Sequence, residues 1–176
     1  NGYEVRCIIF RTSNYNTNEM NAAIEICTKN KVIYSHVDIV GLMNGLGAKE
    51  KFHNIYDSIP NIMGIMLSIA ASYSISQGIN SVAHVCREKN KENPQESFSF
   101  LQATRKQLGE CSVPGVKFFS PYYKMEDQEI IENGIKLKVP FEKTWSCNDS
   151  AVVACGMCSK CTKRKNALKM YNQEKS

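Results

Sequence analysis

An α/β fold with an open, mostly parallel sheet flanked by helices is the fold class that the sequence predicts. Short apolar segments of strand length alternate along the chain with segments whose apolar residues recur at helical spacing. The 176 residues are enough to bury a continuous core without disulfides, and 43% hydrophobic and 22% charged residues are typical of a globular domain. This composition excludes the disordered, collagen-like and coiled-coil classes.

The first three elements are expected in the order strand, helix, strand. Residues 3–10 alternate in polarity and then become continuously apolar, which is typical of a strand buried on both faces of a parallel sheet. A helix is predicted over residues 16–29, where Glu19 follows Asn16 by three residues as in a capping box. Residues 31–39 again have strand character, so the connection between the two strands is long enough for a right-handed crossover.

The middle of the chain is expected to contain a deeply buried helix. Glycines interrupt residues 41–57, which are predicted to form an irregular loop or a short helix. Residues 61–77 follow Pro60, a helix-start signal, and end at Gly78; they are apolar on more than one side, which predicts a helix packed against a sheet. The longest apolar run here is about ten residues, well short of the roughly twenty that cross a bilayer, so no transmembrane helix is predicted.

The remaining elements are shorter, and the chain shows no internal repeat or linker. Residues 1–176 are therefore expected to form a single domain, with a cysteine-rich module at residues 144–171 within it. The predicted elements of this part are a strand over 81–85, a polar loop over 87–94, a helix over 95–108, an extended segment over 116–120, and helices over 126–133 and 162–171.

Four of the eight cysteines lie within fifteen residues near the end of the chain, in a C-x7-C-x2-C-x2-C pattern. Short spacings let backbone turns aim several thiolates at one point, as a tetrahedral ion with metal–sulfur distances of about 2.3 Å requires. Thiolate ligands favour zinc or iron over magnesium or calcium, and four protein ligands leave no position open for catalysis. The pattern predicts a structural zinc site with the ligands Cys147, Cys155, Cys158 and Cys161.

Two alternatives stay open for these four cysteines. A ferredoxin-type iron–sulfur cluster also uses two-residue gaps, but such runs end in Cys-Pro, and here Thr162 follows the last cysteine. Disulfides are typical of secreted proteins, whereas the residues before Cys7 are too few and too polar for a secretory signal. We therefore expect a reducing, cytoplasmic setting. Cys7 and Cys27 lie in apolar segments and are predicted to be core residues.

The formal net charge of +5 is modest, and much of the excess lies near the end of the chain. The cysteine module lacks the interleaved aromatics and strong basic face of nucleic-acid-binding domains, so neither nucleic acid nor a membrane is expected as a partner. His36, His53 and His84 have no partner in the sequence pattern and are expected in the core or at a strand edge. Trp145 is expected to pack the module onto the sheet. The basic residues near the end, expected to be solvated, are Lys160, Lys163, Arg164, Lys165 and Lys169.

Two segments of the chain resemble one known family. The first is residues 59–71, IPNIMGIMLSIAA, and the second is residues 119–164. The most specific part is Thr-Trp-Ser-Cys at 144–147, followed by Cys-Gly-Met-Cys-Ser-Lys-Cys at 155–161 and by Arg164. These motifs resemble the 7-cyano-7-deazaguanine synthases, the QueC family of queuosine biosynthesis, and the similarity extends over nearly the whole chain.

The resemblance implies an adenine nucleotide alpha hydrolase-like fold, truncated at the N-terminus. It implies conversion of 7-carboxy-7-deazaguanine to the nitrile with ammonia and ATP through an adenylate of the carboxylate. A 7-deazapurine substrate follows from this and, as in many family members, a homodimer. The resemblance also implies that zinc is structural and is held by Cys147, Cys155, Cys158 and Cys161, in agreement with their spacing.

The chain departs from the family at the motifs that bind nucleotide and substrate. The ATP pyrophosphate loop, Ser-Gly-Gly-x-Asp-Ser, is absent and would lie upstream of Asn1, where a segment is expected to be missing. Residues 60–63 are Pro-Asn-Ile-Met where the family has Pro-Gly-Arg-Asn, residues 12–15 replace an aromatic-Gly-Gln element, and residues 93–97 replace a Tyr-Pro-Asp-Cys-Arg loop. No catalytic or cofactor-binding residue is therefore assigned, and ATP is expected only if the loop exists upstream.

Two hypotheses for the function follow. In the first, the chain is a working synthase whose phosphate loop lies upstream. In the second, it is a catalytically degenerate relative that keeps the fold and the zinc and has a structural or interaction role with a protein partner. Ile62, Met63 and Gln95 favour the second, because each polar group of a substrate buried without a partner costs about 1–3 kcal/mol.

Overall fold

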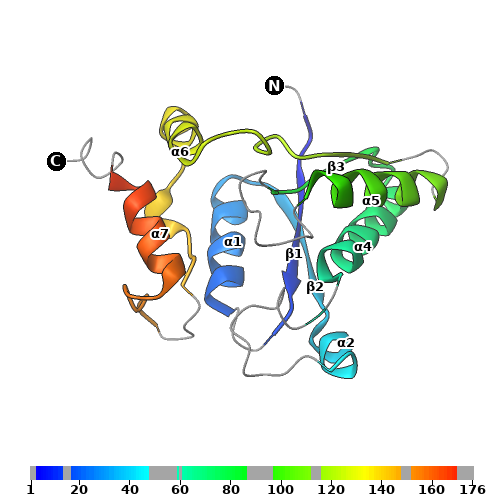
Figure 1. The fold of residues 1–176 in the computed structure, drawn as a ribbon, viewed down its shortest axis with the longest axis horizontal. Coiled ribbons are helices and arrows are strands. Elements are labelled where there is room, and N and C mark those ends of the chain that lie inside the picture. The colour runs from blue at the N-terminus through cyan, green and yellow to red at the C-terminus, as the bar shows by residue number, and fades with distance from the viewer. Residues whose placement is uncertain are drawn as a thin grey trace. The chain divides into compact units, whose positions relative to one another are not determined.

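The fold is known from a computed structural model that describes residues 3–13, 17–47, 59, 61–86, 97–111, 116–147 and 152–169. The chain divides into two units, coloured along the sequence in Figure 1. The first unit comprises Asn1–Ile59 and Asp127–Ser176, and the second comprises Pro60–Glu126. Each unit has its own pair of parallel strands.

In the first unit, β1 (Arg6–Arg11) and β2 (Ile33–Asp38) form a parallel pair, and α1 (Thr17–Lys29) connects them. The register joins the first residue of β1 to the first of β2 and the last to the last. Figure 1 shows α1 running alongside the two strands, as a helix must when it returns the chain to the start of a parallel strand. The predicted strand, helix and strand are confirmed, although β1 begins at Arg6 instead of Tyr3. The expected cap residue Asn16 lies outside the described residues.

The core between β1 and α1 is small and contains two of the scattered cysteines. Ile9 and Cys27 are buried, as their apolar surroundings in the sequence predict, whereas Cys7 is only half-buried. Burial, followed by the neighbouring Cys27 thiol, raises the pKa of Cys7 to about 11. Cys7 is therefore a neutral thiol near pH 7 and behaves as a packing residue.

A short helix, α2 (Val40–Gly45), follows β2 directly. It is one of the two outcomes predicted for residues 41–57, of which residues 48–57 lie outside the described residues. Met43 is almost completely buried, which anchors this short element although six residues are too few for a helix to be stable by itself.

The second unit contains α4 (Ile62–Ser76), β3 (Ser81–Ala83), α5 (Phe98–Cys111) and β4 (Lys117–Phe119). β3 and β4 pair in parallel, with Ser81 opposite Lys117. All four elements were predicted, with ends that differ by a few residues. Pro60 and the predicted polar loop over 87–94 lie outside the described residues.

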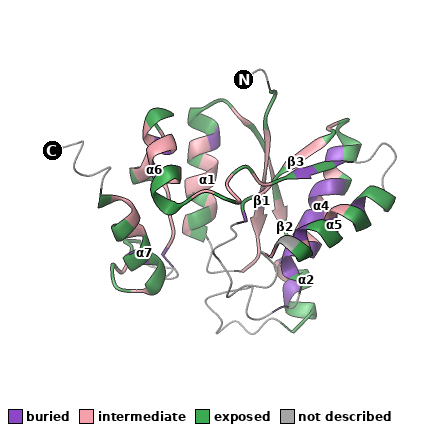
Figure 2. Cartoon of the chain, turned by 45° about the horizontal axis from the view of Figure 1, so that its top comes forward, coloured by how far each residue is buried: buried purple, intermediate pink, exposed green. Residues whose placement is uncertain are grey.

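The helix α4 supplies much of the buried surface of the second unit, as Figure 2 shows. This confirms the prediction of a deeply buried helix that ends at Gly78. Gly78 has a φ of +67°, and the Ile79 N–H donates to the Ser74 carbonyl at 2.8 Å, which closes the last turn. The buried residues of α4 are Ile62, Met63, Gly64, Leu67, Ala70, Ala71 and Ser74.

The chain then returns to the first unit through α6 (Asp127–Lys136), a 3-10 turn η2 (Phe141–Lys143) and α7 (Ser159–Ala167). Gly134 of α6 faces the Phe141 ring so closely that a Cβ atom there would lie 2.4 Å from Phe141 Cζ. The predicted start of the last helix at residue 162 was wrong. α7 starts at Ser159, because Cys158 caps the helix, and this places Cys161 in its first turn.

The α/β class with parallel strands and flanking helices is thus confirmed for the described residues. Within them the strands form two pairs, β1 with β2 and β3 with β4. The finer predictions, a single open sheet of the adenine nucleotide alpha hydrolase type and a single domain over 1–176, stay predictions. Among the helices that the structure describes, none is long and apolar enough to cross a membrane.

Candidate metal centre

The four cysteines of the C-x7-C-x2-C-x2-C pattern converge on one point in the first unit. Cys147 follows η2, Cys155 and Cys158 lie on the next loop, and Cys161 lies in α7. The four Sγ atoms all lie within 4.8 Å of one another. The structure therefore brings together every site residue that the spacing predicted, in a cluster that can hold a metal ion.

The sulfur–sulfur distances match the geometry of a single tetrahedral ion. Cys147 Sγ is 3.5 Å from Cys155 Sγ, and Cys155 Sγ is 4.0 Å from Cys161 Sγ. A tetrahedron with metal–sulfur distances of about 2.3 Å has edges of about 3.8 Å. A cluster of several irons would need its ligands distributed around more than one metal atom, and hence farther apart.

Local backbone features aim the sulfurs inward. Gly156 has a φ of +74°, a conformation that glycine adopts without strain, and it turns the chain between Cys155 and Cys158. The Cys161 N–H donates to Cys158 Sγ at 3.4 Å, and the Cys155 N–H donates to Cys147 Sγ at 3.4 Å. These backbone N–H groups stabilise sulfur in its anionic, metal-binding form.

The surroundings of the cluster disfavour a thiolate at Cys161 unless a cation is bound. Burial, followed by the neighbouring thiols, raises the pKa of Cys161 to about 12. Without a metal ion this sulfur therefore stays protonated at neutral pH. A divalent cation would replace the protons and balance the thiolate charge, so its binding would weaken as the pH falls.

A second layer of polar contacts surrounds the sulfurs. The guanidinium group of Arg164, on α7, donates to Thr144 Oγ1 and to the Phe141 carbonyl, both at 2.6 Å. Trp145 is half-buried, and its indole N–H donates to the Cys147 carbonyl at 3.0 Å. The expectation that Arg164 is a solvated basic residue was wrong: it is half-buried and bonded. Its position three residues after Cys161, on the same side of a helix, was the signal that could have shown this.

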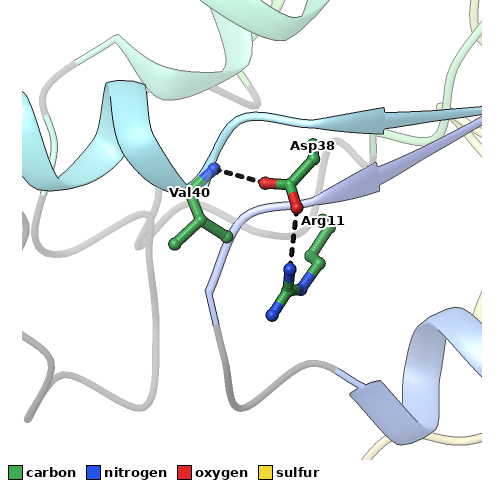
Figure 3. Close-up of polar contacts among 3 residues, drawn as sticks. All are labelled: Arg11, Asp38 and Val40. Carbon is green, nitrogen blue, oxygen red and sulfur yellow. Dashed lines mark hydrogen bonds and ion pairs between the residues drawn. The ribbon is translucent and has the colours of Figure 1, made fainter.

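Polar side chains also end the strands of the first unit, where α/β folds commonly bind ligands. Figure 3 shows Asp38 at the end of β2 accepting hydrogen bonds from the Val40 N–H at 3.0 Å and from Arg11 Nη1 at 2.7 Å. The Val40 N–H, followed by the Arg11 guanidinium, holds the pKa of Asp38 below its usual value. Both side chains are at least one-third exposed, and the contact fixes the start of α2.

In the second unit, the residues after β3 form a different polar group. The Cys86 N–H donates to Ser120 Oγ, which in turn donates to the Cys86 carbonyl. His84 is half-buried, and burial, followed by the charge of Arg105, lowers its pKa. His84 Nδ1 and Arg105 Nε are buried and have no hydrogen-bond partner among the described residues. Of the other histidines, His36 is exposed on β2, and His53 lies outside the described residues.

The comparisons with known proteins point to one family. A sequence model described as "Queuosine biosynthesis protein QueC" matches residues 1–172. The 7-cyano-7-deazaguanine synthase of Caldicellulosiruptor bescii is 28% identical over 184 residues, which cover 96% of this chain and 82% of that protein. The 7-cyano-7-deazaguanine synthase 1 of Colwellia psychrerythraea is 24% identical, with coverage of 97% and 85%. A synthase of the same name from Methanosarcina mazei is 31% identical over 63% of this chain and 48% of that protein.

Proposed function

The chain belongs to the QueC family of queuosine biosynthesis proteins, and we propose that it serves that pathway as a 7-cyano-7-deazaguanine synthase homologue. The reaction would convert 7-carboxy-7-deazaguanine to the nitrile with ammonia and ATP. The observation that carries the proposal is the match over residues 1–172, which includes the four cysteines whose sulfurs converge in the structure.

We further propose that the cysteine cluster holds one zinc ion. The donor set is four soft thiolates within 4.8 Å of one another, which fits zinc better than magnesium or calcium. With all four positions taken by protein sulfur, the ion would supply binding energy that joins Cys147, Cys155, Cys158 and Cys161 and would leave no open position for a reacting group. Cys147, Cys155, Cys158 and Cys161 are the residues that would hold it.

The sequence lacks the family's phosphate-binding motif for ATP. A Ser-Gly-Gly-x-Asp-Ser turn is absent from residues 1–176, and a loop of that kind cradles phosphate through its backbone N–H groups. The synthase proposal therefore requires such a loop outside these residues, and we derive no catalytic step through ATP.

A catalytically degenerate role is the second candidate, and the packing of α4 favours it. Ile62 is fully buried and Met63 nearly so, at positions where the resemblance placed polar residues of the family. These two side chains contribute to the core of the second unit instead of offering hydrogen bonds to a heterocycle. A protein of this kind would keep the metal centre and act through a protein partner.

A single pair of measurements separates the two candidates. The zinc-loaded full-length protein, with any residues encoded upstream of Asn1, is titrated with ATP and magnesium in a calorimeter, and it is then incubated with 7-carboxy-7-deazaguanine, ATP and ammonia while the nitrile is followed by mass spectrometry. Saturable ATP binding with nitrile formation supports the synthase. A folded, zinc-loaded protein that binds no ATP and forms no nitrile contradicts the synthase for this chain and supports the degenerate role.

A further inference from the structure

Arg164 lies on α7, on the same face as Cys161. Arg164 follows Cys161 by three residues, a spacing that places two side chains next to each other on a helix, while Cys158 caps the start of this helix from the preceding loop. Lys160, Lys163 and Lys165 of the same helix are exposed, whereas Arg164 is half-buried. Arg164 is therefore the cation of α7 that is withdrawn from solvent beside the cluster.

The guanidinium group binds the segment that leads to the first sulfur. Arg164 Nη1 donates to Thr144 Oγ1 and Nη2 donates to the Phe141 carbonyl, each at 2.6 Å. The Thr144 hydroxyl donates to the same Phe141 carbonyl at 2.7 Å, so its oxygen is left to accept from Arg164. The two-pronged contact uses the planar fork of arginine, which a lysine ammonium cannot reproduce.

The segment that receives Arg164 is itself fixed within the first unit. The Phe141 ring fills the space above Gly134 of α6. Lys143 forms an ion pair with Glu25 of α1 at 2.8 Å. Arg164 therefore ties α7 to a segment that contacts α6 and α1 and that leads on to Cys147.

We propose that Arg164 is a positioning residue for the metal centre: it holds Cys161 of α7, and with it Cys158 at the start of that helix, in place against the segment that carries Cys147, and its charge offsets part of the excess negative charge of a four-thiolate site. The inference rests on the proposed metal centre and deepens it. Outer residues that orient metal ligands typically change metal affinity by about 10–100-fold, so the effect is measurable.

The test compares metal affinity among variants at one fixed pH. Zinc affinity is measured by competition with a chromogenic chelator, and Co²⁺ is used in parallel because its visible spectrum reports tetrahedral thiolate coordination. We expect Arg164→Met to weaken binding by about 10-fold or more and Arg164→Lys to recover only part of the loss. Thr144→Val removes one acceptor and is expected to weaken binding by less than Arg164→Met does.

Lys163→Met is the matched control, since it removes an exposed cation from the same helix. It is expected to leave the affinity within about twofold of the wild type. Arg164→Met with unchanged affinity would overturn the inference, as would an equal loss in Lys163→Met. If Arg164→Met fails to fold, the zinc affinities of Arg164→Lys and Thr144→Val are compared with that of the wild type. Unchanged affinity in both variants would then overturn the inference. If the wild-type protein binds neither Zn²⁺ nor Co²⁺, the proposed metal centre itself is contradicted. If the wild type binds zinc tightly and Arg164→Met binds it equally tightly, only the role of Arg164 is contradicted.

Discussion

At the residue scale, the role of each cysteine is decided by what surrounds its sulfur. Cys27 is buried among apolar residues of β1 and α1, whereas Cys158 and Cys161 are met by other sulfurs and by backbone N–H groups. A buried thiol in an apolar core serves as a small hydrophobe, whereas four converging sulfurs can bind a cation. The same side chain therefore packs in one place and can bind a metal ion in another.

Cys158 permits a test that separates metal binding from helix formation. Cys158→Ser removes a sulfur but keeps an oxygen that can cap α7, because serine is a favoured N-cap residue. We expect zinc affinity to fall by more than the roughly 100-fold that outer residues reach. Thermal melting with excess chelator should be nearly the same for the variant and the wild type. Equal zinc content in both proteins would contradict the ligand assignment.

His84 predicts a loss of stability in mild acid. Burial, followed by Arg105, lowers its pKa, so the folded state binds this proton less readily than the unfolded state does. The contribution of neutral His84 to the free energy of unfolding is therefore fully present above the unfolded pKa of about 6.5, and it is lost as the pH falls below that value. The free energy of unfolding is measured with urea, in the presence of chelator, between about pH 7 and pH 5. It should fall less steeply with decreasing pH in His84→Gln than in the wild type. His36→Gln, at an exposed position, is the control and should retain the wild-type slope.

The sequence was most informative where chemistry depends on spacing. The four sulfurs follow from short gaps between cysteines, which leave the backbone few ways to separate them. Arg164 was missed as a bonded residue because a run of basic residues has the same composition whether or not one member turns inward. The family motif that ends in Arg164 singled out this residue, and the three-residue interval from Cys161, once the start of α7 is known, places Arg164 on the same face of the helix.

At the element scale, helix ends were harder to predict than helices. α7 begins at Ser159 because a cysteine caps it, and caps are normally sought among serine, threonine, aspartate and asparagine. α4 was predicted well because it is apolar over most of its length and is buried, whereas β1 is half-buried except at Ile9 and begins three residues later than predicted. Contacts between elements, such as Phe141 of η2 on Gly134 of α6, leave no periodic signal in the sequence.

Gly134 offers a test of how tightly η2 packs on α6. Gly134→Ala would place a Cβ atom 2.4 Å from Phe141 Cζ, so the ring must move. We expect a destabilisation of about 1–3 kcal/mol by urea unfolding, although alanine is the better helix former. Gly109→Ala in α5 is the matched control, since a Cβ atom there has no neighbour within 4 Å. It should stabilise by up to about 1 kcal/mol. Stabilisation by both variants would contradict the packing described for η2.

At the scale of the whole molecule, the chain combines two parallel strand pairs in separate units with a metal centre in the first. The order of strands and helices was predictable, because periodicity distinguishes the two. The pairing of the strands was less predictable, since the apolar pattern of a strand does not indicate which other strand lies beside it. The resemblance to the family came from motifs instead of periodicity, and the most specific of them lie in the cysteine module.

The location of the metal centre predicts which segments lose local stability when the metal ion is removed. Chelation should raise amide hydrogen exchange in α7 and in residues 141–147, because the ion would join these two segments. Exchange in β3 and β4 of the second unit should change little. Hydrogen exchange followed by mass spectrometry, with and without chelator, measures both. Equal increases in the two units would mean that the metal stabilises more than its own surroundings.

X-ray absorption at the zinc edge of the purified protein measures the ligands of the ion. We expect one zinc per chain with four sulfur neighbours at about 2.3 Å and no lighter ligand. Loss of this signal in Cys158→Ser should accompany loss of the ion. A shell of nitrogen or oxygen neighbours, fewer than four sulfurs, or iron in place of zinc with a metal–metal distance would contradict the account.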